Sequence, residues 1–331
     1  MPASNSVPDI SVIVPVYGVE PFAERCARAL MEQTLADGVE FLFVDDASPD
    51  RSMEIIRQVI EEYPKRQKQV KILTLSQNRG LPAARNTGLD AARGQYIVHV
   101  DSDDNLEPQM LAEMLAAARR TGADYVWSDW FLTFADNQRA MAEPDAASPD
   151  EALRLQLSGR MKYNVWNKML ARRLYDETGI RFPEGYGMGE DMTMIMLLCK
   201  ARRVAHVGQP LYHYLRTNPG AFTADSAKRA ASLNSLKHNA DRVIEYLSVN
   251  GVAPELIDRF KLSAKWPLLV SDSPEDFATW RRWWPEANGA ISRCCMSLRS
   301  RLLQQTAARG WRWPSLLYNK LIKTLYGKIY R

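Results

Sequence analysis

The chain has 331 residues, of which 46% are hydrophobic and 25% are charged, and its formal net charge is +4. This is the composition of an ordinary soluble globular protein, and the length allows about two domains or one α/β domain with an appendage. The longest apolar runs fall far short of the ~20 residues that span a bilayer, and the start "MPASNSVPD" lacks the basic and apolar parts of a secretory signal. We therefore expect a protein that does not cross a membrane by itself.

Cysteine usage indicates a reducing compartment. The four cysteines are Cys26, Cys199, Cys294 and Cys295. They show no CxxC spacing, and an adjacent pair rarely forms a disulfide and suggests no metal site. We predict reduced thiols in a cytoplasmic protein.

The first hundred residues alternate between strand and helix patterns. The β-branched run at 10–17 ("ISVIVPVY") predicts a buried strand, and segment 20–34 has helical periodicity. The pattern then repeats, with predicted strands at 39–48, 70–76 and 95–100 and predicted helices at 50–63, N-capped by Asp50, and 81–94, closed by Gly94. Four alternations within about 95 residues predict an α/β fold, a doubly wound and mostly parallel central sheet flanked by helices.

Polar residues gather where the predicted strands end. They are Tyr17, Asp45, Asp46, Asn78 and the cluster from Asp101 to Asp104. In doubly wound sheets ligands bind at the carboxyl ends of the strands. We therefore expect the functional site at this edge of the sheet.

Beyond Glu107 the pattern is more mixed. A helix is predicted at 108–122 and a strand at 123–134, followed by a polar stretch at 135–151 that we predict to be a mobile loop. Past residue 224 the alternation stops and the sequence reads as helices. We accordingly divide the chain into two halves of one α/β domain and a helical C-terminal region, with the boundaries 1–105, 106–224 and 225–331.

The acidic cluster "DSDD" at 101–104 has two interpretations. Hard divalent cations such as Mg²⁺ and Mn²⁺ prefer oxygen ligands, and one of them would offset the repulsion among the three aspartates. The alternative is a solvated acidic turn. An EF-hand loop is excluded because it needs glycine and glutamate where this chain has Leu106 and Ala112. The absence of GxGxxG and GxxxxGK[ST] leaves dinucleotide and P-loop sites without support.

Three segments together carry a resemblance to a known family. They are "SVIVPVYG", "VDDASPDRS" and "NRGLPAARNTGLDAARGQYIVHVDSDD". In this order they closely resemble the family 2 glycosyltransferases, which are nucleotide-sugar-dependent enzymes of the GT-A fold. The resemblance is dense over residues 10–105 and looser to about 223. Gly18, Ala47 and Pro49 replace the family's usual Asn, Gly and Thr, and none of these departures removes a carboxylate.

The resemblance implies a binding site for the nucleotide base. The segment Pro15, Val16 and Tyr17 would line the base through main chain and ring. Asp46 would accept a hydrogen bond from an imide N–H, a contact suited to uracil. Asp45 is interpreted instead as a structural carboxylate that faces a neighbouring loop.

The resemblance also implies roles near the diphosphate. Arg85 would approach the ribose or the diphosphate, and Asp101 would hold ribose or sugar hydroxyls. Asp103 would coordinate Mn²⁺ or Mg²⁺, with Asp104 as a second participant, and Asp104 is also a predicted substrate-binding residue. Asn78 is interpreted as a turn former.

A second pair of carboxylates, Glu190 and Asp191, enters a predicted helix. A carboxylate at a helix N-terminus is stabilised by the helix dipole, so capping is one interpretation. The resemblance implies another, in which Asp191 is the general base that deprotonates the acceptor hydroxyl and Glu190 orients donor or acceptor hydroxyls. Three glycines in "GYGMG", at 185–189, would permit a substrate-gated loop.

Two further segments match the family pattern. In "LYHYLRTNPGAFT", the residues His213, Arg216 and Thr223 would close over the diphosphate, although a histidine flanked by tyrosines is as often packed in a strand. In "NVWNKML", the segment 166–168 would face the acceptor, with stacking of Trp166 on a sugar ring as the rationale. Core packing of Trp166 is an equal alternative.

The last 45 residues carry a separate charge pattern. From Ala287 to Arg331 there are nine basic residues and no acidic one, so the rest of the chain carries a net charge of −5. Trp, Tyr and Leu are interleaved with these cations. Three interpretations stay open: an amphipathic helix on an anionic membrane, a nucleic-acid-binding segment, and a terminal helix packed on the domain. We favour peripheral contact with the inner face of the cytoplasmic membrane, because acceptors in this family are often lipid-linked glycans, and we expect no nucleic acid.

These observations predict a metal-dependent, inverting glycosyltransferase of cell-surface polysaccharide synthesis, for example of lipopolysaccharide or capsule. It would move a sugar from a nucleotide sugar, UDP-linked in our interpretation, to a hydroxyl of a glycan or lipid-linked glycan. The alternative is a non-catalytic, membrane-attached homologue that binds nucleotide or glycan. A nucleotidylyltransferase lacks support because "SVIVPVYGVEP" has no Gly- and basic-rich triphosphate signature. The sequence names neither the sugar nor the acceptor.

Overall fold

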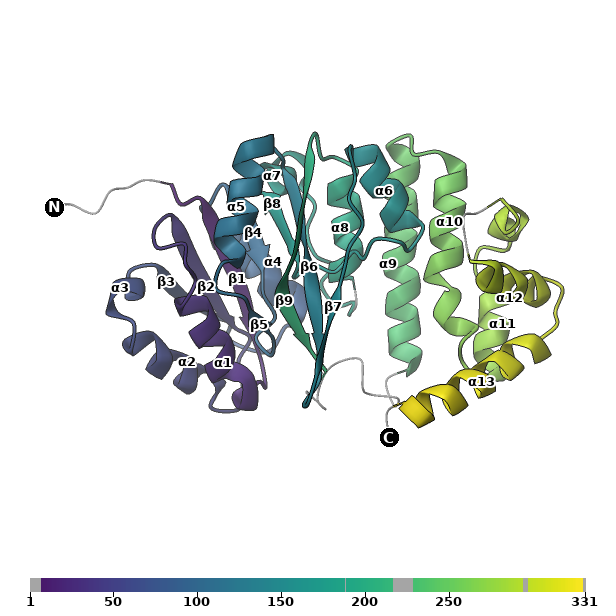
Figure 1. Ribbon diagram of the computed structural model, residues 1–331, viewed down its shortest axis with the longest axis horizontal. Helices are drawn as coiled ribbons and strands as arrows, with labels where there is room; N and C mark the ends of the chain where they lie inside the picture. The colour runs from purple at the N-terminus through teal and green to yellow at the C-terminus, as the bar shows by residue number, and fades with distance from the viewer. Residues whose placement is uncertain (1–6, 188, 217–228, 294–296, 330–331) are drawn as a thin grey trace. The chain divides into compact units, whose positions relative to one another are not determined.

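The computed structural model describes residues 7–187, 189–216, 229–293 and 297–329 (Figure 1). Contacts within the chain divide it into two compact units. The first unit comprises residues 1–153 and 162–239, and the second comprises 154–161 and 240–331. The functional halves that we predicted, with boundaries after residues 105 and 224, stay predictions.

The first unit contains one mixed sheet, which has nine strands among the described residues. The strand order is β3-β2-β1-β4-β8-β6-β9-β5, and β7 pairs with β6. The first four strands are parallel neighbours, with the bounds Ile10–Val16 (β1), Val39–Asp45 (β2), Val70–Thr74 (β3) and Tyr96–His99 (β4). They confirm the predicted doubly wound α/β fold.

The register of these strands places their carboxyl ends at one edge. β1 pairs Val16 with Asp45 of β2 and Ile13 with His99 of β4. Every residue of β1 is buried, as the uninterrupted apolar run predicted. The segments that follow β1, β2 and β4 therefore leave the sheet side by side.

Helices in the N-terminal half follow the strands as predicted, with small differences at their ends. They are α1 (Glu20–Met31), α2 (Ser52–Glu61), α3 (Pro64–Gln67), α4 (Leu81–Ala91) and α5 (Met110–Thr121). α2 begins later than predicted, and Asp50 accepts a hydrogen bond from Ser52 N without being the N-cap residue. α4 ends before Gly94, whose absent Cβ would lie 2.4 Å from Ser11 N, so this glycine permits close approach to β1 instead of closing the helix.

The C-terminal half of the first unit completes the sheet. Its strands are β5 (Asn105–Leu106), β6 (Tyr125–Thr133), β7 (Gln138–Met141), β8 (Lys168–Ala171) and β9 (Val204–Leu215). β8 is antiparallel to both β4 and β6, whereas β9 runs parallel to β6. The stretch 135–151, predicted as a mobile loop, contains β7 and the start of α6 (Pro149–Leu157), because β7 pairs with the end of β6. Two further helices are α7 (Arg173–Thr178) and α8 (Glu190–Leu198).

The C-terminal region is helical, as predicted. It contains α9 (Arg229–Val249), α10 (Pro254–Ala264), α11 (Pro274–Arg282), α12 (Leu298–Ala308) and α13 (Trp313–Ile329), with 3₁₀ turns at Trp266–Leu268 and Pro285–Ala290. The core of the second unit holds Trp280, which is fully buried, with Lys265 Nζ 4.2 Å from its ring centroid. Across the described ranges no helix combines the length and apolarity needed to span a membrane.

Candidate active site

The ends of β1 and β2 hold the residues predicted to line a nucleotide base. Pro15 and Val16 are buried, whereas Tyr17 is 48% exposed, so its ring is the part of this segment that a ligand can reach. Asp45 ends β2, and its Oδ1 accepts a 2.9 Å hydrogen bond from Ser48 N. This contact shapes the turn after the strand.

Asp46 is buried and organises the turn before α4. Its Oδ1 accepts a hydrogen bond from Arg79 N at 2.7 Å, and its Oδ2 accepts one from Gly80 N at 2.8 Å. Gly80 has a φ of +86°, a conformation that glycine adopts without strain. Each carboxylate oxygen keeps a second lone pair. Asp46 could therefore still accept the predicted hydrogen bond from an imide N–H, and this contact stays a prediction. Two main-chain donors hold the carboxylate in place.

Arg85 is a buried cation at the centre of the site. It lies on α4, is 1% exposed, and its Nη2 donates to Asp101 Oδ1 at 2.5 Å. Within the described ranges its Nε and Nη1 have no hydrogen-bond partner. Phe182 lies beside the guanidinium, with 6.0 Å between Arg85 Cζ and the ring centroid. The charge of Arg85 is thus paired on the side of Asp101, and two of its donors are available on the others.

The other two aspartates of the cluster have different surroundings. Asp104 is 1% exposed; its Oδ2 accepts from the Tyr212 hydroxyl at 2.7 Å and its Oδ1 from Leu215 N at 2.8 Å. Burial, and then the charges of Asp101 and Asp103, raise the pKa of Asp104 well above its usual range. Asp103 is partly buried, and its carbonyl accepts from a guanidinium of α1. These contacts favour fastening β9 as the role of Asp104, and its predicted contact with substrate stays a prediction.

The chemistry of this cluster suits a divalent cation. Carboxylate oxygens are the ligands that Mg²⁺ and Mn²⁺ prefer. In the described part of the chain, however, no group of three or more His, Cys, Asp or Glu residues is arranged to hold a metal. A cation at Asp103 would therefore take one or two ligands from the protein and the rest from a bound ligand or water.

The second acidic pair occupies the first turn of α8. Asp191 Oδ1 accepts a 2.9 Å hydrogen bond from Val165 N instead of capping its own helix, and Glu190 is 6% exposed. The residue before them, Gly189, is packed so closely that an added Cβ would lie 2.2 Å from Pro183 Cγ. A glycine is required there because any side chain would displace the start of α8.

Both carboxyls of this pair have raised pKa values. Burial is the main cause, and it raises the pKa of Glu190 to about 7 and that of Asp191 to about 6. The positive charge of Arg85 lowers both pKa values, and the negative charge of Asp101 raises both. The structure therefore brings Arg85, Asp101, Glu190 and Asp191 within electrostatic reach of one another. A carboxyl with a pKa near neutrality is suited to accept a proton.

Asn86, for which the sequence suggested no role, fixes the segment before α8. Its Nδ2 donates to Phe182 O at 3.0 Å and to Glu184 Oε1 at 3.1 Å, and its Oδ1 accepts from Phe182 N at 2.9 Å. Arg79 donates to the other oxygen of Glu184 at 2.7 Å. Helix α4 therefore holds Asp101 through Arg85 and the segment leading to the acidic pair through the next residue. The run "AARN" was the available signal, but its partner lies 96 positions away.

The residues predicted to close over the diphosphate lie on or after β9. His213 stacks on Phe131 with a centroid distance of 4.7 Å, and its Nε2 lies 2.8 Å from Glu107 Oε1. It is packed in the sheet, which was one of the two alternatives. Arg216 is exposed, and its main-chain N donates to the end of β6. Thr223 lies outside the described residues. The roles of these residues over a diphosphate stay predictions.

The segment 166–168 is buried beside the site. Trp166 stacks on Tyr212 and Tyr214, with centroid distances of 4.5 and 5.5 Å, so core packing describes it better than stacking on a sugar. Asn167 donates to Ser128 O at 2.8 Å and accepts from Lys168 Nζ at 2.6 Å. Burial lowers the pKa of Lys168 to about 8, against the opposing charges of Glu143 and Asp191.

The chain resembles known proteins in sequence. The profile of the family described as glycosyl transferase family 2 matches residues 11–188. The chain is 30% identical over 280 residues to the uncharacterized glycosyltransferase EpsJ of Bacillus subtilis, covering 81% of this chain and 78% of EpsJ. It is 32% identical over 215 residues to the putative glycosyltransferase EpsH of the same organism, covering 62% and 60%.

Solved structures with the same fold include S. aureus TarS 1–349 in complex with UDP-GlcNAc. It superposes with a TM-score of 0.68 at 18% identity, over 97% of this chain and 92% of that one. The mannosyltransferase PcManGT from Pyrobaculum calidifontis, in complex with GDP-Man and Mn²⁺, superposes with a TM-score of 0.56 at 20% identity, covering 98% and 89%. At these identities the likeness concerns the fold.

Proposed function

Because this chain belongs to glycosyl transferase family 2 and is a glycosyltransferase, we propose that it transfers a sugar from UDP to a hydroxyl of a glycan or lipid-linked glycan. Two further relatives are named for polymer biosynthesis: the succinoglycan biosynthesis protein ExoO of Rhizobium meliloti and the minor teichoic acid biosynthesis protein GgaB of Bacillus subtilis. We place this chain in the same kind of pathway, the synthesis of bacterial cell-surface polymers. The UDP donor is supported by TarS, which has been crystallised with UDP and with UDP-GlcNAc.

The observation that carries the proposal is the acidic pair at the start of α8, on which the charges of Arg85 and Asp101 act. Asp191 Oδ1 accepts a hydrogen bond from Val165 N, and burial raises the pKa of this carboxyl to about 6. At neutral pH it is largely ionised and accepts the proton of the acceptor hydroxyl. The acceptor oxygen then bonds to the anomeric carbon from the face opposite the diphosphate, whose bond to that carbon breaks. One displacement inverts the configuration.

The donor side is assigned as predicted. Tyr17 and Asp46 contact the base, and Arg85 donates from Nε and Nη1 to the ribose or diphosphate. Asp101 accepts from sugar hydroxyls, and Glu190 orients the reacting sugars. Asp103 would hold Mn²⁺ or Mg²⁺, which when bound neutralises charge on the departing diphosphate.

A thermal-shift screen tests the donor. UDP, GDP and TDP sugars are compared with and without Mn²⁺, and we expect the largest increase in melting temperature with a UDP-sugar in the presence of Mn²⁺. Release of UDP on addition of glycan or lipid-linked acceptors then tests turnover. Binding without turnover on any acceptor would favour the non-catalytic, nucleotide- or glycan-binding homologue.

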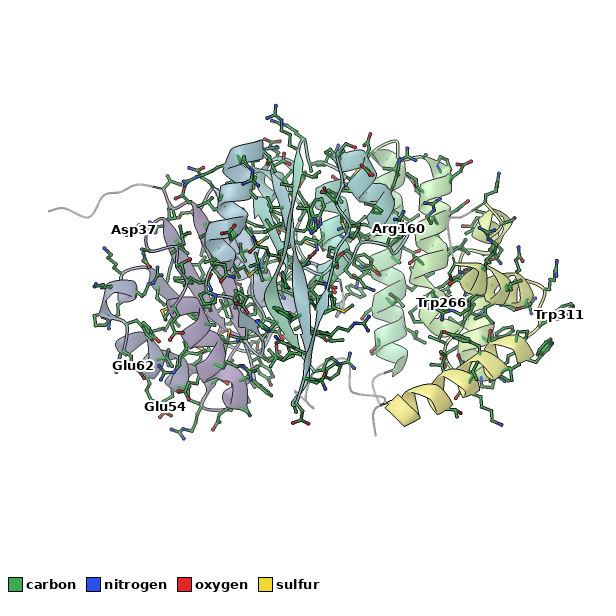
Figure 2. All side chains as sticks on the ribbon, viewed as in Figure 1. Asp37, Glu54, Glu62, Arg160, Trp266 and Trp311 are labelled. Carbon is green, nitrogen blue, oxygen red and sulfur yellow. The ribbon has the colours of Figure 1, made fainter. Side chains whose placement is uncertain are left out.

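We further propose that α12 and α13 contact the anionic inner face of the cytoplasmic membrane. Exposed apolar side chains accumulate on these helices and the turn between them, and Trp311 extends outward in Figure 2. They are Leu298, Leu302, Trp311, Trp313, Leu316, Leu317 and Leu321. Arg299 and Arg309 cover neighbouring aromatic rings at 5.1 and 5.8 Å. Aromatic, aliphatic and cationic side chains together suit a lipid headgroup region.

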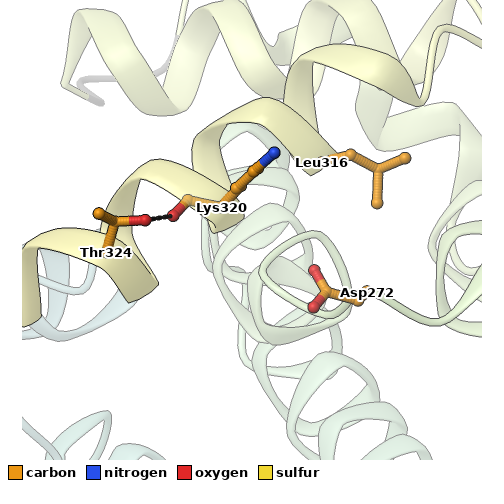
Figure 3. A pocket seen from close by; sticks show the side chains of 4 residues that line it. All are labelled: Asp272, Leu316, Lys320 and Thr324. Carbon is orange, nitrogen blue, oxygen red and sulfur yellow. Dashed lines mark hydrogen bonds between the residues drawn. The ribbon is translucent and has the colours of Figure 1, made fainter. Parts of the chain in front are cut away.

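A cavity beside α13 is not suited to bind the phosphate of a single lipid headgroup. It measures about 480 Å³ and is lined by Asp272, Leu316, Lys320 and Thr324 (Figure 3). A carboxylate on its wall opposes binding of a phosphate. Membrane attraction would therefore come from positive charge spread along the helices. The sequence adds Lys323, Lys328 and Arg331 to this charge, and their side chains lie outside the part described.

Sedimentation with vesicles tests the membrane proposal. The change of Trp313, Leu317 and Leu321 to serine should abolish cosedimentation with phosphatidylglycerol vesicles while sparing turnover on a soluble acceptor. Val249→Ser, which alters an even more exposed apolar residue on α9, is the control. Unchanged sedimentation of the triple variant contradicts the proposal.

A further inference from the structure

The segment Lys162–Val165 is fastened at both ends beside the proposed general base. Lys162 N donates to Glu143 Oε2 at 2.9 Å, and Val165 N donates to Asp191 Oδ1 at 2.9 Å. Glu143 is itself held, because its other oxygen accepts from Trp130 Nε1 at 3.0 Å. The two residues between these attachments therefore have little freedom to move away from Asp191.

Those two residues, Tyr163 and Asn164, present polar groups that the described part of the protein does not use. Both are partly buried. Throughout the described ranges, no hydrogen bond involves the side chain or the main-chain N–H of either residue. Their neighbour Asn167 differs, since its amide is satisfied by Ser128 O and Lys168. Partly buried polar groups that lack a protein partner are usually satisfied by water or a ligand.

The chemistry at Asp191 determines what lies next to this segment. A general base must approach the hydroxyl that it deprotonates to about 2.6–3.2 Å. The remaining atoms of that sugar then extend only a few ångströms from the carboxylate. The main chain that donates to Asp191 belongs to the same short segment as Tyr163 and Asn164, and the charge of Asp191 acts on the Tyr163 phenol. A sugar held at Asp191 therefore lies next to this segment.

From this juxtaposition we propose that Tyr163 and Asn164 form the subsite for the acceptor sugar, and that this subsite takes a hydroxyl-bearing pyranose ring. The proposal rests on the proposed function, in which Asp191 activates the acceptor. The phenol donates to a ring hydroxyl, and its aromatic face covers the apolar face of the sugar. The Asn164 amide accepts and donates to neighbouring hydroxyls, a combination that distinguishes one hydroxyl configuration from another.

The electrostatics of Tyr163 agree with a donor role. Burial, and then the negative charge of Asp191, raise the pKa of Tyr163 to about 12. The phenol therefore keeps its proton throughout the working range of the enzyme, and it does not compete with Asp191 as a base. Its hydroxyl adds no charge to a site that already holds several carboxylates.

The test compares Tyr163→Phe and Asn164→Ala with the wild type in the full chain. Initial rates are measured with the best UDP-sugar and with p-nitrophenyl glycosides of glucose, galactose and N-acetylglucosamine as soluble acceptors. For the glycoside that the wild type uses best, each variant should raise the acceptor KM about tenfold, leave the donor KM unchanged, and release more UDP per glycoside product because water replaces the sugar.

Tyr63→Phe is the matched control, since it removes a hydroxyl that donates to Glu32 at the exposed end of α2. It should leave both KM values unchanged. Melting temperatures of all variants should stay within 2 °C or so of the wild type, because neither subsite side chain supports the fold through a hydrogen bond. A purely structural role would lower stability without separating the two KM values.

Two results overturn the proposal, and they are distinguishable. Unaltered acceptor KM and unaltered UDP-to-product ratio in both variants, with a fully active wild type, overturn the acceptor subsite alone. A wild-type protein that binds nucleotide sugars but releases no UDP with any of the glycosides or with lipid-linked glycan acceptors overturns the proposed function and the subsite with it.

Discussion

Two acidic regions of the first unit contain similar residues in different surroundings. After β4, the carboxylate of Asp101 contacts the guanidinium of Arg85, and that of Asp104 accepts from Tyr212 and Leu215 N. At the start of α8, Asp191 has one main-chain donor from Val165, and no salt bridge within the described residues involves it. Burial raises a carboxyl pKa in both regions, but only the first also has a carboxylate in an ion pair among the described residues.

This difference assigns two tasks, binding of a charged ligand and transfer of a proton, which the residue types alone do not distinguish. After β4, three carboxyls lie close together beside the guanidinium of Arg85, and oxygen ligands next to positive charge suit a cation and a diphosphate. Carboxyls whose burial raises their pKa to about 6 and 7 are arranged to exchange a proton near neutral pH. Arg85 connects the two, because its charge acts on both regions.

Asp191→Asn should produce the largest effect. The amide keeps the shape of the side chain and can still accept from Val165 N, but it cannot take a proton. We expect kcat for transfer to fall by about 10²–10⁴-fold with donor affinity unchanged. Steady-state transfer and calorimetric titration with UDP measure the two quantities. Asp176→Asn, an exposed aspartate on α7, is the control; equal activity of the two variants contradicts the assignment of the base.

Asp103→Asn changes the region after β4 and should lower the affinity for UDP rather than the rate of proton transfer. If Asp103 holds the cation, UDP affinity in Mn²⁺ should fall by about 10–100-fold, and UDP affinity in EDTA should not change. Calorimetric titrations under the two conditions measure this directly. The same loss in EDTA contradicts the metal assignment, because it assigns Asp103 to the nucleotide itself.

Sequence patterns predicted the first region better than the second. The strands at 10–17, 39–48, 70–76 and 95–100 follow from local apolar periodicity, and parallel pairing then places their carboxyl ends together. The partners of Asp104 and Asn86 lie 96 or more positions away and are set by β9 and the segment before α8. A single sequence contains no signal for such pairings. Burial, which sets the pKa of Glu190, depends on them.

The pH dependence of turnover should identify the second region. Asp191 must be ionised to act as the base, so log kcat should rise with unit slope below about pH 6 and level off above the apparent pKa values of the pair, about 6 and 7. Glu190 has the higher pKa and is largely protonated where Asp191 titrates, so Glu190→Gln should leave this limb near pH 6. Rates at saturating substrate from pH 5 to 9 test this. A limb that moves to lower pH in Glu190→Gln would mean that Glu190 ionises before Asp191, which contradicts this order of titration.

Stability should respond in opposite directions in the two regions. Tyr212→Phe keeps the stacking on Trp166 but removes a donor from the buried carboxyl of Asp104, so it should cost about 1–3 kcal/mol. Glu190→Gln should instead stabilise the protein at pH 8. The folded-state pKa of Glu190, about 7, lies above its ordinary 4.5, so its favourable contribution is present below pH 4.5 and is lost as the pH rises through 7. Urea unfolding at pH 5 and 8 measures both changes. Destabilisation by Glu190→Gln at pH 8 would mean that the folded protein favours the ionised form of Glu190, which contradicts its raised pKa.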